Sequence, residues 1–135
     1  MTKFKTELTS HPEIKAQTVG DNDIFELKDP KIQISIYYHS NKLNLMLNNG
    51  SDGDLSFLPL DVNLGTDKKR CTIKEIFEAP RKKIDFKDKY VIEKKSAKSF
   101  FYKFDCEKNA DSYFTINGLT QNGKKITLNF KFSAQ

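Results

Sequence analysis

The chain has 135 residues, a formal net charge of +5, 37% hydrophobic residues and 30% charged residues. This length suits one domain, and the low hydrophobic share argues against a parallel sheet covered on both faces, whose strands are apolar throughout. No apolar stretch approaches the ~20 residues that a membrane-spanning helix needs.

Residues 1–30 have the least regular pattern. Turn signals at His11-Pro12 and at 20–23 separate short segments with extended character. We expect 1–30 to form an N-terminal arm or an edge strand, and 31–135 to form a β-sandwich domain. No apolar signal core follows Met1, so we expect either a cytoplasmic protein or an exported one whose signal has been removed.

Apolar and polar residues alternate over 31–38 and, after a turn at 39–41, over 42–48. Ile32 and Ile34 illustrate the spacing of two residues. Successive side chains of a strand point to opposite faces, so the pattern predicts a hairpin of two strands, each with one buried face.

A polar loop over 49–54 precedes the next extended segment, 55–64. The loop contains Asp52 and Asp54 but lacks the glutamate and flanking helices of an EF-hand, and we assign no metal to it. Proline has no amide donor, so Pro59 predicts that 55–64 is an edge strand or is interrupted there.

Short strands continue to the end of the chain. They are predicted over 71–77, 82–86, 90–92, 99–105, 111–117 and 124–132. Asn122-Gly123 favours a turn with positive φ between the last two strands. Many short strands at roughly ten-residue spacing predict an all-β fold, an antiparallel β-sandwich of 7–9 strands.

The order of these features supports a family resemblance. A strand with an Asn-rich end (43–49) leads to a Phe/Pro/Asp segment (57–62), and an aromatic strand (99–104) precedes a closing hairpin (113–130). Over about 90 residues this pattern resembles Ig-like domains of bacterial secreted and envelope-associated proteins. The chain has no Trp and lacks the Cys–Trp–Cys spacing of antibody domains. The resemblance implies a binding or assembly role.

Cys71 and Cys106 are the two cysteines of the chain, and each lies near the end of a predicted strand. One hypothesis is a disulfide, which by the chain-entropy model contributes ~3–4 kcal/mol of stability. The alternative is a pair of free thiols in a cytoplasmic protein. The sequence leaves both open.

No arrangement of residues indicates catalysis, and we expect no enzymatic activity, cofactor or metal. The two histidines, His11 and His39, both fall in predicted turns, and there is no C-x-x-C motif. Basic neighbours before Cys71 would lower a thiol pKa, but the sequence places no base beside it.

Positive charge is concentrated over 68–98, where twelve Lys or Arg residues stand against five acidic ones. The clusters that we single out as a candidate basic surface are Lys68, Lys69, Arg70, Arg81, Lys82 and Lys83. Such a surface suits a polyanion or an acidic protein. Lysine dominance and interspersed acidic residues equally fit a solvated surface, and nucleic-acid binding is the less favoured interpretation.

Doubled aromatic residues raise the hypothesis of an apolar patch. If Phe101 and Phe114 both face outward, they offer a surface to a partner. Two functions follow for testing. The first is a non-enzymatic protein-binding module of the bacterial cell envelope or of a secretion complex, periplasmic or secreted. The second is a cytoplasmic protein that binds a polyanion or acidic partner through 68–98.

Overall fold

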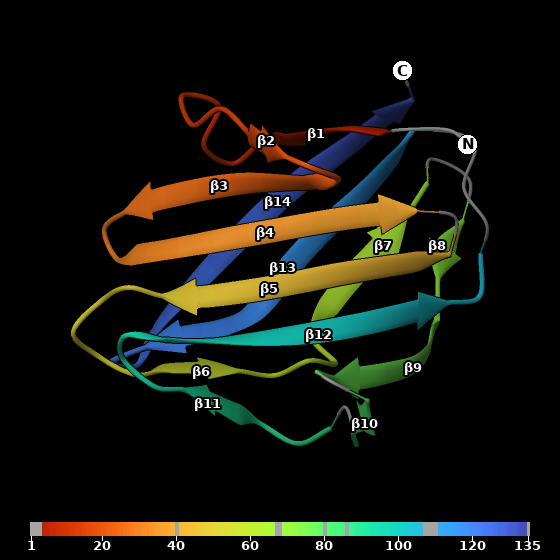
Figure 1. Cartoon of the computed structure of the whole chain (residues 1–135). Coiled ribbons are helices and arrows are strands. Elements are labelled where there is room, and N and C mark those ends of the chain that lie inside the picture. Colours follow the sequence, from red (N-terminus) through yellow and green to blue (C-terminus); the bar gives the residue numbers. More distant parts are fainter. Residues whose placement is uncertain are drawn as a thin grey trace.

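The computed structural model describes residues 4–39, 41–66, 69–79, 81–85, 87–106 and 111–134. Over these residues the ordered elements are strands, arranged as two antiparallel sheets of seven strands each (Figure 1). The two sheets pack face to face as a sandwich. The predicted all-β class is therefore confirmed.

Sheet A has the order β1-β14-β13-β6-β11, and β7 and β8 extend it beside β13. Its strands are β1 (Phe4–Leu8), β14 (Lys124–Ala134), β13 (Ser112–Gln121), β6 (Leu55–Phe57), β11 (Tyr90–Ile92), β7 (Val62–Gly65) and β8 (Arg70–Cys71). The strand β1 lies at one edge of this sheet and pairs with β14 alone.

Sheet B has the order β10-β9-β12-β5-β4-β3-β2. Its strands are β10 (Lys82–Lys83), β9 (Ile73–Glu78), β12 (Ser96–Phe104), β5 (Lys42–Asn49), β4 (Lys31–His39), β3 (Asn22–Lys28) and β2 (Gln17–Val19). The segment before residue 31 thus contributes one strand to sheet A and two to sheet B.

The number of strands differs from the 7–9 predicted, because the described residues form fourteen, several of them only two or three residues long. Pro59 explains one of the differences. It interrupts 55–64 into β6 and β7, as its missing donor predicts. Both short strands still pair with β13.

The core lies between the sheets and is formed by every second residue of the long strands. Ile34 and Leu45 from sheet B and Phe130 and Phe132 from sheet A are at most 1% exposed. The buried faces predicted from alternation are confirmed for β4, β5, β12 and β14. Burial of these apolar faces is the main favourable contribution to folding.

Aromatic rings join the two sheets. The centroids of Phe25 and Phe130 are 5.4 Å apart with an edge-on geometry, and those of Tyr38 and Phe132 are 4.5 Å apart. Aromatic pairs of this kind contribute ~0.5–1.5 kcal/mol beyond the area that they bury. The strand β3, which supplies Phe25, is therefore part of the core.

One end of the sandwich is closed by a disulfide between Cys71 and Cys106, whose Cα atoms are 5.7 Å apart. Cys71 ends β8 in sheet A, and Cys106 follows β12 of sheet B. The bond therefore links the two sheets covalently. Of the two hypotheses for these cysteines, the disulfide is confirmed.

The opposite end is closed by the buried side chain of Asn49, the last residue of β5. Its Nδ2 group donates to the carbonyl oxygens of Gly53 (2.8 Å) and Ile92 (3.0 Å). Its Oδ1 atom accepts from the amide of Ser51 (3.1 Å) and from the hydroxyl of the same residue. Because Ile92 belongs to β11, this network ties sheet B to sheet A.

We predict that replacing both cysteines by alanine lowers the free energy of unfolding by about 3–4 kcal/mol, because the bond restricts the unfolded chain across 35 residues. Urea unfolding of the variant and of the wild type measures the difference. Wild-type protein with the disulfide reduced is the control that keeps both sulfur atoms. An unchanged midpoint after reduction contradicts the prediction.

A second prediction concerns Tyr102, whose buried hydroxyl donates to the carbonyl oxygen of Pro59 (2.8 Å). Burial raises the pKa of Tyr102 well above its usual value. The phenol stays neutral in the folded protein at a pH where the phenol of the unfolded chain ionises. The contribution of Tyr102 to the free energy of unfolding is therefore intact below pH ~10 and is lost as the pH rises further. Burial likewise raises the pKa of Tyr38, against a smaller opposing effect of Ser112.

We therefore expect the free energy of unfolding of the wild type to fall steeply above pH ~10. That of Tyr102→Phe should fall less steeply, and the two slopes should differ by ~1.4 kcal/mol per pH unit. At neutral pH this variant loses ~1–2 kcal/mol, because the Pro59 carbonyl loses its donor. Urea unfolding across this pH range provides the slopes, and Tyr113→Phe, at an exposed position, is the control. Identical slopes for wild type and Tyr102→Phe contradict this account.

Candidate functional site

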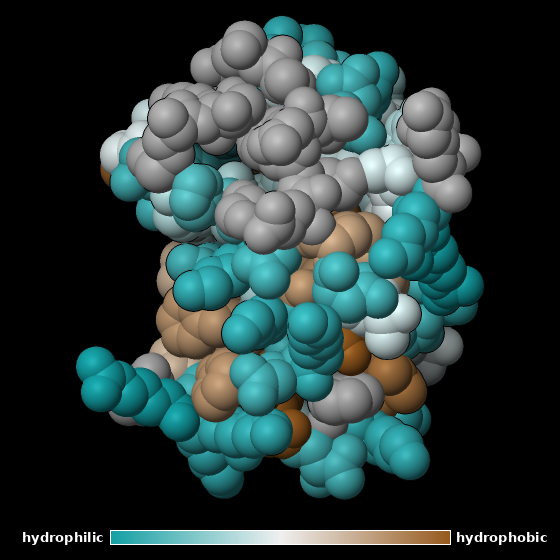
Figure 2. Space-filling model, turned by 90° about the vertical axis from the view of Figure 1, so that its right-hand side faces the viewer, coloured by the Kyte–Doolittle hydropathy of each residue, from teal (hydrophilic) through white to brown (hydrophobic). Residues whose placement is uncertain are grey.

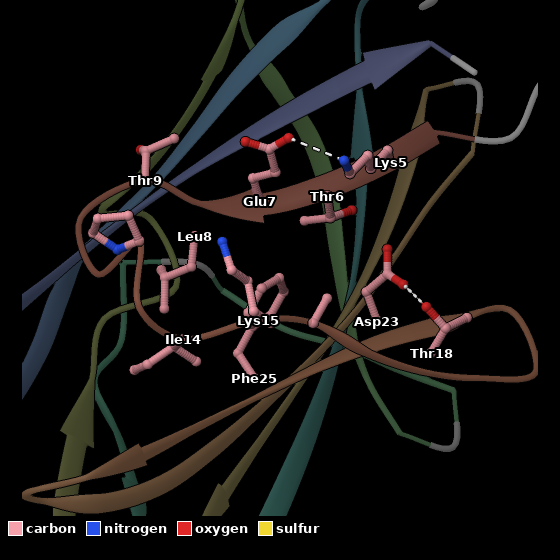
Figure 3. A pocket seen from close by; sticks show the side chains of 12 residues that line it. Lys5, Thr6, Glu7, Leu8, Thr9, Ile14, Lys15, Thr18, Asp23 and Phe25 are labelled. Carbon is pink, nitrogen blue, oxygen red and sulfur yellow. Dashed lines mark hydrogen bonds and ion pairs between the residues drawn. The ribbon is translucent and has the colours of Figure 1, made fainter.

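A cleft of about 520 Å³ lies where the N-terminal edges of the two sheets meet (Figure 3). One wall is β1 of sheet A, and the other comes from β2 and β3 of sheet B. Leu8, Ile14 and Phe25 give it an apolar floor, and Lys5 and Glu7 lie along the β1 wall.

The cleft exists because the chain crosses from one sheet to the other after Leu8 without closing the space between them. The amide of Thr9 donates to the carbonyl of Asn129 on β14 (2.8 Å), and the amide of Asn129 donates to the hydroxyl of Ser10 (3.1 Å). A turn follows, in which the His11 amide donates to the Leu8 carbonyl (3.3 Å). These bonds fix the end of β1 and turn the chain toward β2.

The backbone of β1 faces β14 on one side and the cleft on the other. In an antiparallel ladder, residues alternate between those that bond to the neighbour and those that point away. Thr9 bonds to Asn129, and this register makes Lys5 and Glu7 the residues that bond to β14. The amide and carbonyl of Thr6 and the amide of Leu8 therefore point away from β14, on residues that are only 6% and 2% exposed.

Charged side chains frame the apolar floor. Lys5 forms an ion pair with Glu7 at 3.6 Å on the outward face of β1. On the opposite wall, the hydroxyl of Thr18 donates to Asp23 (2.8 Å). The exposed Lys15 reaches into the space between the two walls, as Figure 3 shows. The cleft thus combines an apolar floor, backbone groups of β1 that do not bond to β14, and a cation at its rim.

The disulfide end contains one cluster of metal-ligating residue types among the described residues. Potential ligand atoms of Cys71, Asp105 and Cys106 lie within 4.8 Å of one another. The two sulfur atoms are bonded to each other, so they are not thiolates. A hydrogen bond from the Thr72 backbone lowers the pKa of Asp105, and the ammonium of Lys69 adds to that effect. The carboxylate is thereby engaged in holding the disulfide loop.

The basic residues singled out in the sequence do not gather in one place. Arg70 lies on β8 of sheet A, whereas Lys82 and Lys83 on β10 pair with Glu78 and Phe77 at the far end of β9 in sheet B. Arg81 is exposed in the turn before β10. Lys68 lies outside the described residues.

Several of these cations already have partners. Lys69 lies 3.9 Å from a carboxylate oxygen of Asp105, and Lys83 lies 3.7 Å from Glu75. The guanidinium of Arg70 donates to the side chain of Asn63. The described part of this segment is therefore better explained as dispersed surface charge than as a single basic surface.

The predicted patch of Phe101 and Phe114 is wrong. Phe114 is 0% exposed and belongs to the inner face of β13 in sheet A, whereas Phe101 is half-buried on the outer face of β12 in sheet B. Ile116, two residues after Phe114, is buried on the same side and packs in the same core. The two phenylalanines thus belong to opposite layers.

Figure 2 shows the side of the molecule that lies at the right of Figure 1. Hydrophilic side chains cover most of its described surface, and smaller apolar areas lie between them. Within the described residues, no helix has the length and apolar character needed to cross a bilayer.

Sequence reasoning did not identify the cleft. Its residues come from β1, from the connection over 9–16, from β2 and from β3, and no motif links them. The only available signal was the predicted edge-strand character before residue 31. Comparison with known proteins adds no assignment, because no protein-family model, curated protein or solved structure shows significant similarity to the chain.

Proposed function

We propose that this protein is a non-enzymatic binding module that captures an extended segment of a partner protein along β1, adding a strand to sheet A. The observation that carries the proposal is the backbone of Thr6 and Leu8, which points away from β14 on residues that line a cleft with an apolar floor. An extended peptide presents amides and carbonyls at the matching spacing, and strand addition of this kind is a common mode of peptide recognition.

The side chains around β1 define the chemistry of the bound segment. Alternate residues of an added strand would point toward Leu8, Ile14 and Phe25, and these residues should be apolar. A carboxylate on the segment would lie near Lys15. The charges of Lys5 and Glu7 on β1 limit indiscriminate pairing at this edge.

The proposed setting is the bacterial cell envelope or a secretion-related complex, with the protein periplasmic or secreted. The disulfide supports it, because such bonds persist mainly in oxidising compartments. The resemblance of the strand pattern to Ig-like envelope domains points the same way. The second function, polyanion binding in the cytoplasm through 68–98, has less support, because the basic clusters lie at opposite ends of β9.

The test uses a displayed library of short peptides selected on the wild-type protein. We expect the selected sequences to alternate apolar and polar residues and to include an acidic residue. Thr6→Pro should weaken their binding at least about tenfold, because it removes an edge donor and places a ring in the path of the added strand.

Thr6→Val is the matched control, since it keeps the backbone amide and nearly the same side-chain shape, and it should bind like the wild type. Thermal unfolding monitors whether both variants are folded. Equal peptide affinity of a folded Thr6→Pro variant, or a library that yields no binding peptide, would overturn the proposed function.

A further inference from the structure

The outer face of sheet B carries an aromatic row, three rings and one asparagine, that crosses four strands. Phe77 on β9 is opposite Phe101 on β12, Phe101 is opposite Asn44 on β5, and Asn44 is opposite Tyr37 on β4. All four side chains are partly exposed. Their neighbours in each strand are buried on the inner face, so the row lies on the outside of the sandwich, on the sheet at the front of Figure 1.

A row of two lysines and one histidine runs beside the aromatic row. Lys103 on β12 is opposite Lys42 on β5, and Lys42 is opposite His39 on β4. The ring of His39 is parallel to that of Tyr37 within 10°, with centroids 6.2 Å apart. Lys103 is also opposite Glu75, but that carboxylate forms its ion pair with Lys83.

The juxtaposition of Lys42 and Lys103 opposes folding. Like charges directly opposite each other on neighbouring strands are destabilising. Within the described part of the chain, neither lysine has an ion pair that would relieve the repulsion. An anionic group from outside the chain would complement the two adjacent positive charges.

Two serines, a methionine and two amide side chains lie on the other side of the aromatic row. Ser99, Met46 and Ser35 form the next row across β12, β5 and β4, and Asn48 and Gln33 follow. The next row after this one presents amide groups. Amides can both donate hydrogen bonds to hydroxyl groups and accept them.

We propose that this face binds an acidic polysaccharide. The C–H groups on the face of a sugar ring pack against the electron-rich face of an aromatic ring, and Tyr37 and Phe101 offer two such rings. They are two strands apart, about 10 Å, and Asn44 lies between them. Carboxylate or sulfate groups of the chain bind Lys42 and Lys103, and amides bind the hydroxyl groups.

Single-stranded nucleic acid also combines stacking groups with negative charge. The disulfide favours the polysaccharide, because it is typical of oxidising compartments outside the cytoplasm. This face belongs to the outside of sheet B and is separate from the cleft beside β1. The inference therefore goes beyond the proposed peptide binding and does not depend on it.

The test measures binding of the full chain to alginate, a uronate polymer, and to heparin, a sulfated one, by affinity electrophoresis. Neutral dextran and single-stranded oligothymidine are included. We expect retardation by alginate, by heparin or by both, but not by dextran. Retardation by alginate alone identifies carboxylate as the recognised group, and retardation by heparin alone identifies sulfate.

The double variant Lys42→Gln/Lys103→Gln should lose at least about tenfold in affinity, because it removes two charge-assisted contacts. Its thermal midpoint should equal or exceed that of the wild type, because the repulsion is gone. Tyr37→Ala should also weaken binding. Lys28→Gln/Lys31→Gln is the charge-matched control: these two lysines also face each other on sheet B but have no aromatic residue opposite. It should bind like the wild type.

Three results would overturn the proposal. The first is the absence of retardation by both acidic polymers. The second is an equal loss of affinity in the two double-lysine variants, which indicates attraction by net charge alone. The third is tighter binding of oligothymidine through Lys42, Lys103 and Tyr37, which assigns the face to nucleic acid.

Discussion

The alternation of buried and exposed residues along each strand is the constraint on which the rest of the structure depends. Every second side chain is buried in one core between two sheets. The backbone amides and carbonyls of each strand then need hydrogen-bond partners on both sides. Inner strands meet this requirement through their neighbours. At the N-terminal edge of sheet A, strand β1 pairs on one side only, and its other side, with Thr6 and Leu8 almost fully buried, lies beside the cleft.

Two polar or covalent links hold the sheets around that core. The disulfide joins Cys71 of β8 to Cys106, which follows β12. At the other end, the side chain of Asn49 on β5 bonds to Ile92 of β11. Between them, the hydroxyl of Tyr102 reaches across from sheet B to the carbonyl of Pro59, which follows β6. These three links between the sheets hold the β1 edge and the outer face of sheet B in fixed positions. A preformed surface loses less conformational entropy when a partner binds.

The sequence predicted the elements whose signals are local. Alternation located β4, β5, β12 and β14, Pro59 marked the interruption between β6 and β7, and Asn122-Gly123 forms the expected turn with φ of 52° and 76°. The strand β3 was missed, because residues 20–23 have a turn-forming composition and only a short apolar alternation follows.

Features that depend on three-dimensional proximity were harder to predict. Tyr113 and Phe114 are both aromatic, so their order alone does not reveal which one faces the core. Charge counts over 68–98 do not reveal that β9 holds the clusters apart. The cleft and the aromatic row both require the strand order, which places residues from separate parts of the chain side by side.

The most direct test of the account is amide hydrogen exchange along β1, followed by NMR in the free protein. Because Lys5, Glu7 and Thr9 bond to β14, their amides should exchange slowly, and those of Thr6 and Leu8 should exchange fast. Alternating protection would show that the edge is open and available for strand addition. Uniform protection of all five amides would show that the edge is already covered and would contradict the central claim.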